Sequence, residues 1–236
     1  MNTNDTSLQS SSPSSLLPCA LRPRVAAVVA LTAAVLLAGC GALPDRPARA
    51  ALYDFGPGLA SASSPAASAS DATVLPTLAV ADIEASARLE GTQVLYRLGY
   101  ADGNELRPYG LARWSVAPAQ LVQQRMRDAL AVRHTVLGAR ESASIARGGG
   151  RAPHTLRVTL DEFSQYFDAP ESSVGLVRLR ATLVQSQPGG DRVLAQRTFT
   201  ARRPAPSADA AGGVKAMAAA TDAAVAELVV WVDQAR

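Results

Sequence analysis

The sequence has few of the residues from which cross-linked or metal-binding sites are built. Among its 236 residues it contains two cysteines, Cys19 and Cys40, and two histidines. A disulfide scaffold needs several cysteines, and a zinc site of the usual kind needs four closely spaced Cys or His ligands. The composition excludes both architectures. The stability of any folded domain must therefore come from packing.

The chain also lacks a strong charge of either sign. Its net charge is +3, and residues 1–39 contain one acid, Asp5, and two arginines, Arg22 and Arg24, so the remainder carries +2. Lys215 is the only lysine. Nucleic-acid-binding domains concentrate many lysines and arginines on one face. The sequence therefore predicts no nucleic-acid partner.

The apolar run Val25 to Leu37 consists almost entirely of Ala, Val and Leu and follows Arg22 and Arg24. It is shorter than the roughly 20 apolar residues that a membrane-spanning helix needs. A basic segment followed by a short apolar run is typical of a secretory signal peptide.

This run ends in Leu37-Ala38-Gly39-Cys40, which resembles the lipobox of bacterial lipoproteins. The resemblance implies cleavage before Cys40, diacylglycerol on its thiol and acylation of the freed amine. Residues 1–39 are accordingly predicted to be a signal peptide, and Cys40 the attachment site that joins the chain to membrane lipids. Two or three acyl chains hold a protein stably on a membrane, whereas one chain binds marginally. By resemblance to lipoprotein sorting rules, Gly41 in place of Asp favours the periplasmic face of the outer membrane.

The composition then divides the rest of the chain in two. Residues 40–71 are predicted to be a lipidated Ala/Ser/Pro-rich tether with a short strand near 51–55, because Gly56 to Asp71 cannot bury enough apolar surface to order itself. Residues 72–236 are predicted to form one α+β domain.

Hydrophobic periodicity predicts the elements of that domain. Period-two alternation favours strands, and apolar residues at spacings of three and four favour two helices, the first from Pro118 to about Arg133 and the second along the C-terminal segment. Gly138 to Pro153 is predicted to be mostly loop. Because the strands carry one charged face, the predicted fold is a mainly antiparallel sheet with two helices packed on one face, in two layers. The predicted strands are 92–100, 106–115, 155–163, 174–185 and 193–200, with a further strand from about Pro76. Residues 101–104 are predicted to be the turn of a hairpin between the first two, because Gly and Asn tolerate positive φ.

No set of reactive side chains is visible. His134 and His154 lack further ligands at metal-binding spacing. Asp161 and Glu162 are adjacent on a predicted strand, so their carboxylates point to opposite faces and cannot share a proton. The sequence therefore predicts a protein that is not an enzyme and has no cofactor or metal.

Tyr109, Arg113 and Trp114 are the candidate interface residues. These residue types are enriched among the side chains that dominate binding at protein interfaces. A tryptophan on a strand more often fills core space, so the core is favoured for Trp114 and an interface role is the alternative.

The order of these features resembles the ABC-type transport auxiliary lipoprotein family, the PqiC-like group. The resemblance rests on the lipobox cysteine, on Tyr96-Arg97, and on Tyr109 with Arg113-Trp114-Ser115 shortly before the helix that starts at Pro118. It implies an accessory subunit that works with an MCE-domain protein and ABC transporter subunits, in a system that moves lipids between the inner and outer membranes.

Two other functions remain open at this stage. One is a periplasmic shuttle that holds lipid in its own cavity. The other is an envelope-assembly lipoprotein unrelated to transport. A homo-oligomer around a lipid conduit is a further arrangement that the sequence leaves open.

Overall fold

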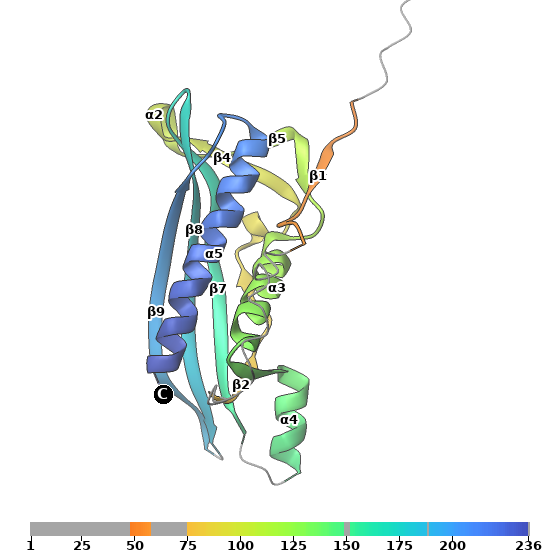
Figure 1. The fold of residues 1–236 in the computed structure, drawn as a ribbon, viewed down its shortest axis with the longest axis vertical. Helices are drawn as coiled ribbons and strands as arrows, with labels where there is room; N and C mark the ends of the chain where they lie inside the picture. Colours follow the sequence, from red (N-terminus) through yellow and green to blue (C-terminus); the bar gives the residue numbers. More distant parts are fainter. Residues whose placement is uncertain (1–47, 58–74, 149–151, 188, 236) are drawn as a thin grey trace, which may run out of the picture. The chain divides into compact units, whose positions relative to one another are not determined.

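The computed structural model describes residues 48–57, 75–148, 152–187 and 189–235. The signal peptide, the lipobox and Cys40 lie outside these residues. From Ala48 onward the chain is one compact unit, shown in Figure 1. Its elements in chain order are β1 (Ala51–Tyr53), β2 (Leu75–Val80), β3 (Glu84–Ala85), the 3-10 turn η1 (Ala87–Leu89), β4 (Gln93–Leu98), α2 (Gly99–Asp102), β5 (Gly103–Trp114), α3 (Pro118–Ala131), β6 (His134–Gly138), α4 (Ala139–Arg147), β7 (His154–Ala169), β8 (Ser172–Gln187), β9 (Gly190–Pro204) and α5 (Ala210–Gln234).

The strands form one nine-stranded mixed sheet built around β7. On one side β7 pairs antiparallel with β8, which pairs antiparallel with β9. On its other side β7 pairs in parallel with β2, β3 and β4 in turn, through Leu78 with His154, Glu84 with Thr159 and Tyr96 with Gln165. The segment from β2 to β4 thus runs along one side of β7 and pairs with it at three successive places.

The prediction of a mainly antiparallel, two-layer sheet with two helices is wrong. Five strand pairs are parallel, namely β1–β5, β2–β6, β2–β7, β3–β7 and β4–β7. Alternation reports which face of a strand is buried, and it is the same whichever way the neighbouring strand runs. The strands β1, β2, β3, β4 and β6, which form these parallel pairs, are also short, so the periodicity of each is weak.

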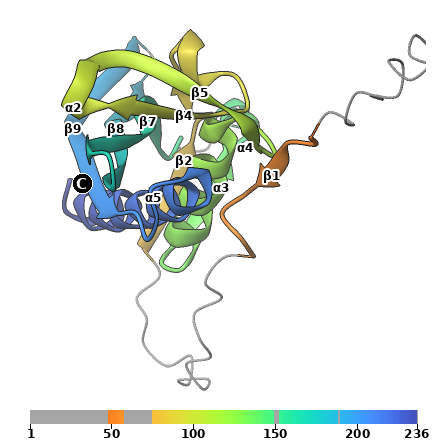
Figure 2. The same cartoon turned by 90° about the horizontal axis from the view of Figure 1, so that it is seen from above.

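Helices α3 and α5 pack beside each other, and α5 crosses β7, β8 and β9 (Figures 1 and 2). The Asp209 carboxylate begins α5 by accepting a hydrogen bond of 2.7 Å from the Gly212 N–H, which satisfies one of the unpaired donors at a helix start. The helix then lies so close to β8 that a methyl group at Gly175 would overlap the backbone of Ala216 and Met217. Glycine at 175 is therefore required by the close approach of helix and strand.

Two local predictions also differ from the structure. The segment from Gly138 was expected to be mostly loop, yet α4 spans Ala139–Arg147. The helix has only nine residues, fewer than the 11–18 over which a helical period can be recognised. Residues 101–104 were expected to be a hairpin turn, and the single-turn helix α2 connects β4 to β5 instead. No helix in the described part of the chain is long and apolar enough to cross a membrane.

Candidate functional site

Strand β1 joins the segment after Cys40 to the folded domain. It pairs in parallel with the end of β5, with Ala51, Leu52 and Tyr53 opposite Ala112, Arg113 and Trp114. The pairing continues one step further, because the Ser115 N–H donates to the Tyr53 carbonyl at 2.8 Å. The predicted interface residues Arg113 and Trp114 are therefore the ones that hold β1 on the sheet.

Phe55 secures the chain directly after β1. Its ring meets the edge of Trp114 with centroids 5.8 Å apart and lies 6.1 Å from the ring of Phe163. The guanidinium of Arg125 on α3 lies over the Phe55 ring and donates a hydrogen bond of 2.8 Å to the Phe55 carbonyl. Arg125 also pairs with Asp222 on α5, with Nε 3.1 Å from Oδ1. Through Phe55 the segment that leaves the tether is fixed to the sheet and both helices.

Trp114 lies in the core, as the sequence favoured, and only 1% of its surface is exposed. Its ring packs on Phe163 with centroids 5.4 Å apart. Its indole N–H finds no acceptor among the described residues. A side chain this buried offers no surface to a docking partner, and its contribution to the site is to support Phe55.

Tyr109 belongs to a polar network inside the domain. Its hydroxyl donates to Gln165 Oε1 at 2.8 Å, and Gln165 Nε2 donates to the Ser173 hydroxyl at 2.7 Å. Gln165 is fully buried, and a methyl group at Gly213 on α5 would overlap its amide. The network thus joins β5, β7 and β8 beneath the first turn of α5.

Arg113 holds an irregular segment of β5 in place. Between the pairs Gln93–Arg113 and Leu95–Pro108 the register of β4 and β5 shifts, so that β5 carries three extra residues. Arg113 Nη1 donates to the carbonyls of Tyr109 and Ala112 at 2.6 and 2.8 Å. Bulged segments of this kind redirect side chains at the edge of a sheet. Arg113 therefore stabilises the bulge that leaves Leu111 exposed.

Burial raises the pKa of Tyr109 from 10.0 to about 12, and the nearby charges of Tyr96 and Asp209 act in the same direction. The folded protein thus retains a proton that the unfolded chain releases at a lower pH. This contribution to stability is complete below about pH 10 and is lost as the pH rises through 12.

A Tyr109→Phe variant tests both roles of this hydroxyl. At pH 7 it should lose about 1–2 kcal/mol of stability, because Gln165 Oε1 loses its donor inside the core. Above pH 10 the difference in stability between the variant and the native protein should shrink, because the native protein then loses the contribution of the Tyr109 hydroxyl. Urea unfolding at pH 7 and pH 11 measures both effects, with Tyr100→Phe as the control because Tyr100 is 48% exposed. An equal difference in stability at pH 7 and pH 11 would contradict the raised pKa of Tyr109.

The two histidines lie apart from this site. His134 starts β6 and is buried, with Nε2 2.8 Å from Asp233 Oδ1 in the last turn of α5. Arg133 Nη1 contacts the other oxygen of the same carboxylate at 2.5 Å. This cluster ties the C-terminal turn of α5 to β6. His154 begins β7, and no group of three or more potential metal ligands occurs in the described residues.

The neighbouring acids Asp161 and Glu162 each have their own arginine. Asp161 accepts from Arg180 at 2.7 Å, and Glu162 accepts from Arg97 at 3.2 Å. Their carboxylates are therefore engaged in separate cross-strand ion pairs.

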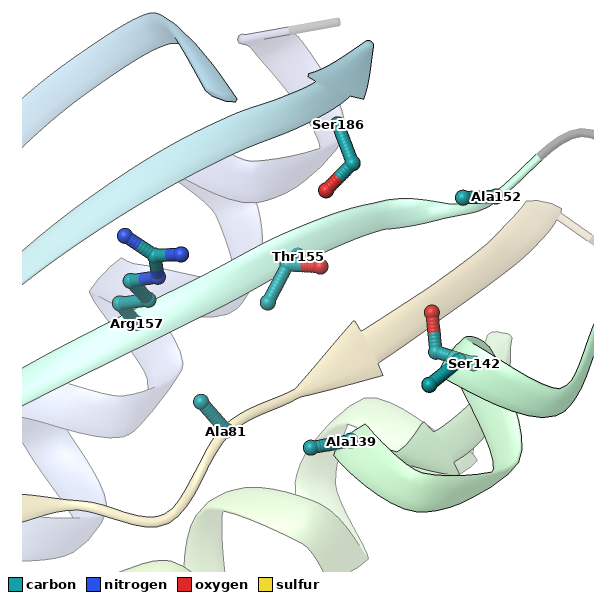
Figure 3. A pocket seen from close by; sticks show the side chains of 8 residues that line it. Ala81, Ala139, Ser142, Ala152, Thr155, Arg157 and Ser186 are labelled. Atoms are coloured by element: carbon teal, nitrogen blue, oxygen red, sulfur yellow. The ribbon is translucent and has the colours of Figure 1, made fainter. Parts of the chain in front are cut away.

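A shallow pocket of about 420 Å³ opens between α4 and the ends of β7 and β8 (Figure 3). Small side chains line most of it. Figure 3 shows Ser142 of α4 and Ser186 of β8 on opposite sides, with Thr155 and Arg157 on β7 between them. Arg157 and Ser186 both bind the carboxylate of Asp191, so these two polar side chains already have a partner. The complete lining is Ala81, Ala139, Ser142, Ala143, Ala152, Thr155, Arg157 and Ser186.

Sequence reasoning missed the residues that secure β1. Phe55 precedes the low-complexity segment, and nothing local connects it to Trp114 or to Arg125, which lies 70 positions later. Gln165 lies beyond the predicted strand 155–163, and the register shift between Leu160 and Glu162 reverses the alternation before it, so no sequence pattern marked it as buried.

Comparison with known families identifies the class of protein. The family model described as "ABC-type transport auxiliary lipoprotein component" matches residues 58–229. The chain belongs to this family, as the sequence predicted, and the family is an auxiliary component of transport associated with the cell envelope. Strand β1 and Phe55 precede the matched residues.

Solved structures share the fold. Protein XCC0632 from Xanthomonas campestris, of family DUF330, is 21% identical, with a TM-score of 0.58 over 69% of this chain and 86% of that chain. An uncharacterized protein is 13% identical, with a TM-score of 0.53 over 78% of this chain and 99% of that chain. At these identities the likeness concerns the fold alone. A search of curated proteins found no match.

Proposed function

We propose that this protein is the outer-membrane accessory subunit of an MCE-type ABC transport system that moves lipids between the inner and outer membranes. Acyl chains on Cys40 anchor it at the periplasmic face of the outer membrane. The folded domain docks on the MCE-domain protein, and its role is to hold and position the assembly. The observation that carries the proposal is the family match over residues 58–229, downstream of a lipobox that ends at Cys40.

The structure supports a mechanical role for the link between anchor and domain. A force applied through the tether arrives at β1, where three backbone pairs to β5 and the enclosed ring of Phe55 resist it. Arg125 connects the Phe55 carbonyl to α3 through its hydrogen bond, and it connects both to α5 through its ion pair with Asp222. A weakly attached strand at this point would separate from the sheet edge, whereas this one is fixed by the aromatic packing of Phe55 and by the hydrogen bond from Arg125 to the Phe55 carbonyl.

Purification of the full-length lipidated protein from its own host in mild detergent tests the proposal. Mass spectrometry then identifies the proteins and lipids that elute with it. An ABC ATPase, its permease and an MCE-domain protein should be enriched over an eluate from the same host without the tagged chain. A second purification after mild crosslinking retains partners that dissociate in detergent.

The remaining outcomes decide between the other functions. Lipid bound to the domain without any transporter subunit would favour the periplasmic shuttle. Outer-membrane assembly proteins in place of transporter subunits would favour an envelope-assembly lipoprotein. Either result would overturn the transport-accessory function.

A further inference from the structure

Two exposed leucines lie where β1 meets β5. Leu52 is 72% exposed and Leu111 is 58% exposed. Leu52 lies opposite Arg113, two residues after Leu111, so the two leucines occupy diagonal positions across the β1–β5 pair. Long side chains at diagonal positions of a strand pair are within reach of each other. We call Leu52 and Leu111 together the leucine edge.

The arrangement around the leucine edge is specific. Leu111 is displayed by the bulge of β5 that Arg113 holds through two carbonyls. Leu52 is held in register by pairing on both sides of it, at Ala51 and Tyr53. Single exposed leucines are common on soluble proteins. Leu52 and Leu111 are each held in a fixed position, one by a paired strand and the other by a bulge, so they can enter a lipid surface together.

The charges beside the leucine edge are two arginines and one acid. Arg49 is exposed immediately before β1. Arg113 uses Nη1 for the carbonyls of the bulge, and its other nitrogens have no hydrogen-bonding partner among the described residues. Asp54 accepts a hydrogen bond of 2.8 Å from the Gly56 N–H and keeps its negative charge, so the surroundings are basic on balance. Apolar side chains flanked by arginines suit the boundary between acyl chains and anionic headgroups.

The length of chain before β1 places this surface near the membrane. Ala51 follows Cys40 by eleven residues. Even fully extended, that stretch spans at most about 40 Å. The part of the domain closest along the chain to the lipid anchor is thus the part that exposes neighbouring leucines with basic flanks.

We propose that the leucine edge lies on the lipid surface and sets the orientation of the domain relative to the membrane. This proposal rests on the anchoring at Cys40 that is part of the proposed function. With Leu52 and Leu111 against lipid, the domain lies on the membrane at β1, and the opposite parts of the domain face the periplasm. The acyl chains supply the attachment, and the leucines supply the orientation.

Site-specific fluorescence tests the proposal in the full lipidated protein. Cys19 leaves with the predicted signal peptide and the thiol of Cys40 is predicted to be acylated, so an introduced cysteine is the only free thiol. Leu52→Cys and Leu111→Cys carry an environment-sensitive dye, and the protein is reconstituted in vesicles of phosphatidylethanolamine and phosphatidylglycerol. Val193→Cys on β9 is the matched control, because Val193 is 61% exposed.

The dye at positions 52 and 111 should shift to shorter wavelength on reconstitution and be quenched by lipids that carry a nitroxide on the acyl chain. The dye at position 193 should keep its aqueous spectrum. Flotation of the vesicles measures anchoring separately. Protein that floats while the dyes at 52 and 111 remain aqueous would overturn the proposal and leave the anchor intact. Shielding from iodide without nitroxide quenching would assign the edge to a protein neighbour, which also overturns it. Failure to float would instead contradict the anchoring at Cys40.

Discussion

A Cys40→Ala variant is expected to lose its acyl chains completely, and the part of it that is cleaved from the signal peptide should appear in the soluble periplasmic fraction. Each acyl CH₂ buried in lipid contributes about 0.8 kcal/mol, so stable anchoring depends on two or three chains. The substitution removes the thiol that carries the diacylglycerol and therefore two of these chains. Two leucines at the surface of the domain bury far less apolar area than the acyl chains and cannot replace them. Fractionation of cells with metabolic labelling by palmitate measures both attachment and acylation.

Cys19→Ala is the matched control for this experiment. Cys19 precedes Arg22 and the apolar run, so it lies in the predicted signal peptide and should have no effect on labelling or fractionation. An uncleaved precursor could remain at the membrane through its apolar run, and its lower mobility on a gel reveals this. A second variant, with a soluble-export signal in place of residues 1–40, removes that ambiguity. Persistence of either cleaved, unacylated protein in the membrane fraction would contradict a lipid anchor at Cys40.

The parts of the fold that the sequence predicted well are those with long, regular patterns. Helix α3 starts at the predicted Pro118, because a proline fits the first turn where its missing N–H is not needed. Strand β8 was predicted over 174–185 and extends over Ser172–Gln187, and β7 was predicted over 155–163 and continues to Ala169. In these elements local periodicity and final burial agree.

The parts that the sequence could not predict depend on long-range pairing. The direction of β2, β3 and β4 is set by the edge of β7 that they follow, and nothing within these short strands encodes it. The candidate site follows the same rule. Tyr109, Arg113 and Trp114 were selected by residue type, whereas their roles depend on Gln165, on the bulge of β5 and on Phe55.

A Trp114→Ala variant is expected to lose about 3–5 kcal/mol of stability, the usual cost of removing a large buried aromatic side chain. The ring fills space between Phe55 and Phe163, and the backbone around it belongs to paired strands that cannot collapse into the gap. For a domain of this size the melting temperature should fall by about 10 °C. Urea unfolding followed by far-ultraviolet circular dichroism is the appropriate measurement, because the substitution removes one of the two tryptophans.

The same cavity should loosen β1 before the rest of the domain unfolds. Phe55 loses its edge-on partner, so the chain around it should become more accessible to a protease under native conditions. Trp114→Phe separates the packing of the ring from its polar atom. Phenylalanine keeps an aromatic ring against Phe55 and removes an indole N–H that has no acceptor among the described residues. Because an unsatisfied buried donor costs about 1–3 kcal/mol, this variant should lose less than about 1.5 kcal/mol and keep β1 protected. Equal losses for the two variants would show that the shape of the indole, and not aromatic packing on Phe55, stabilises this end of the sheet.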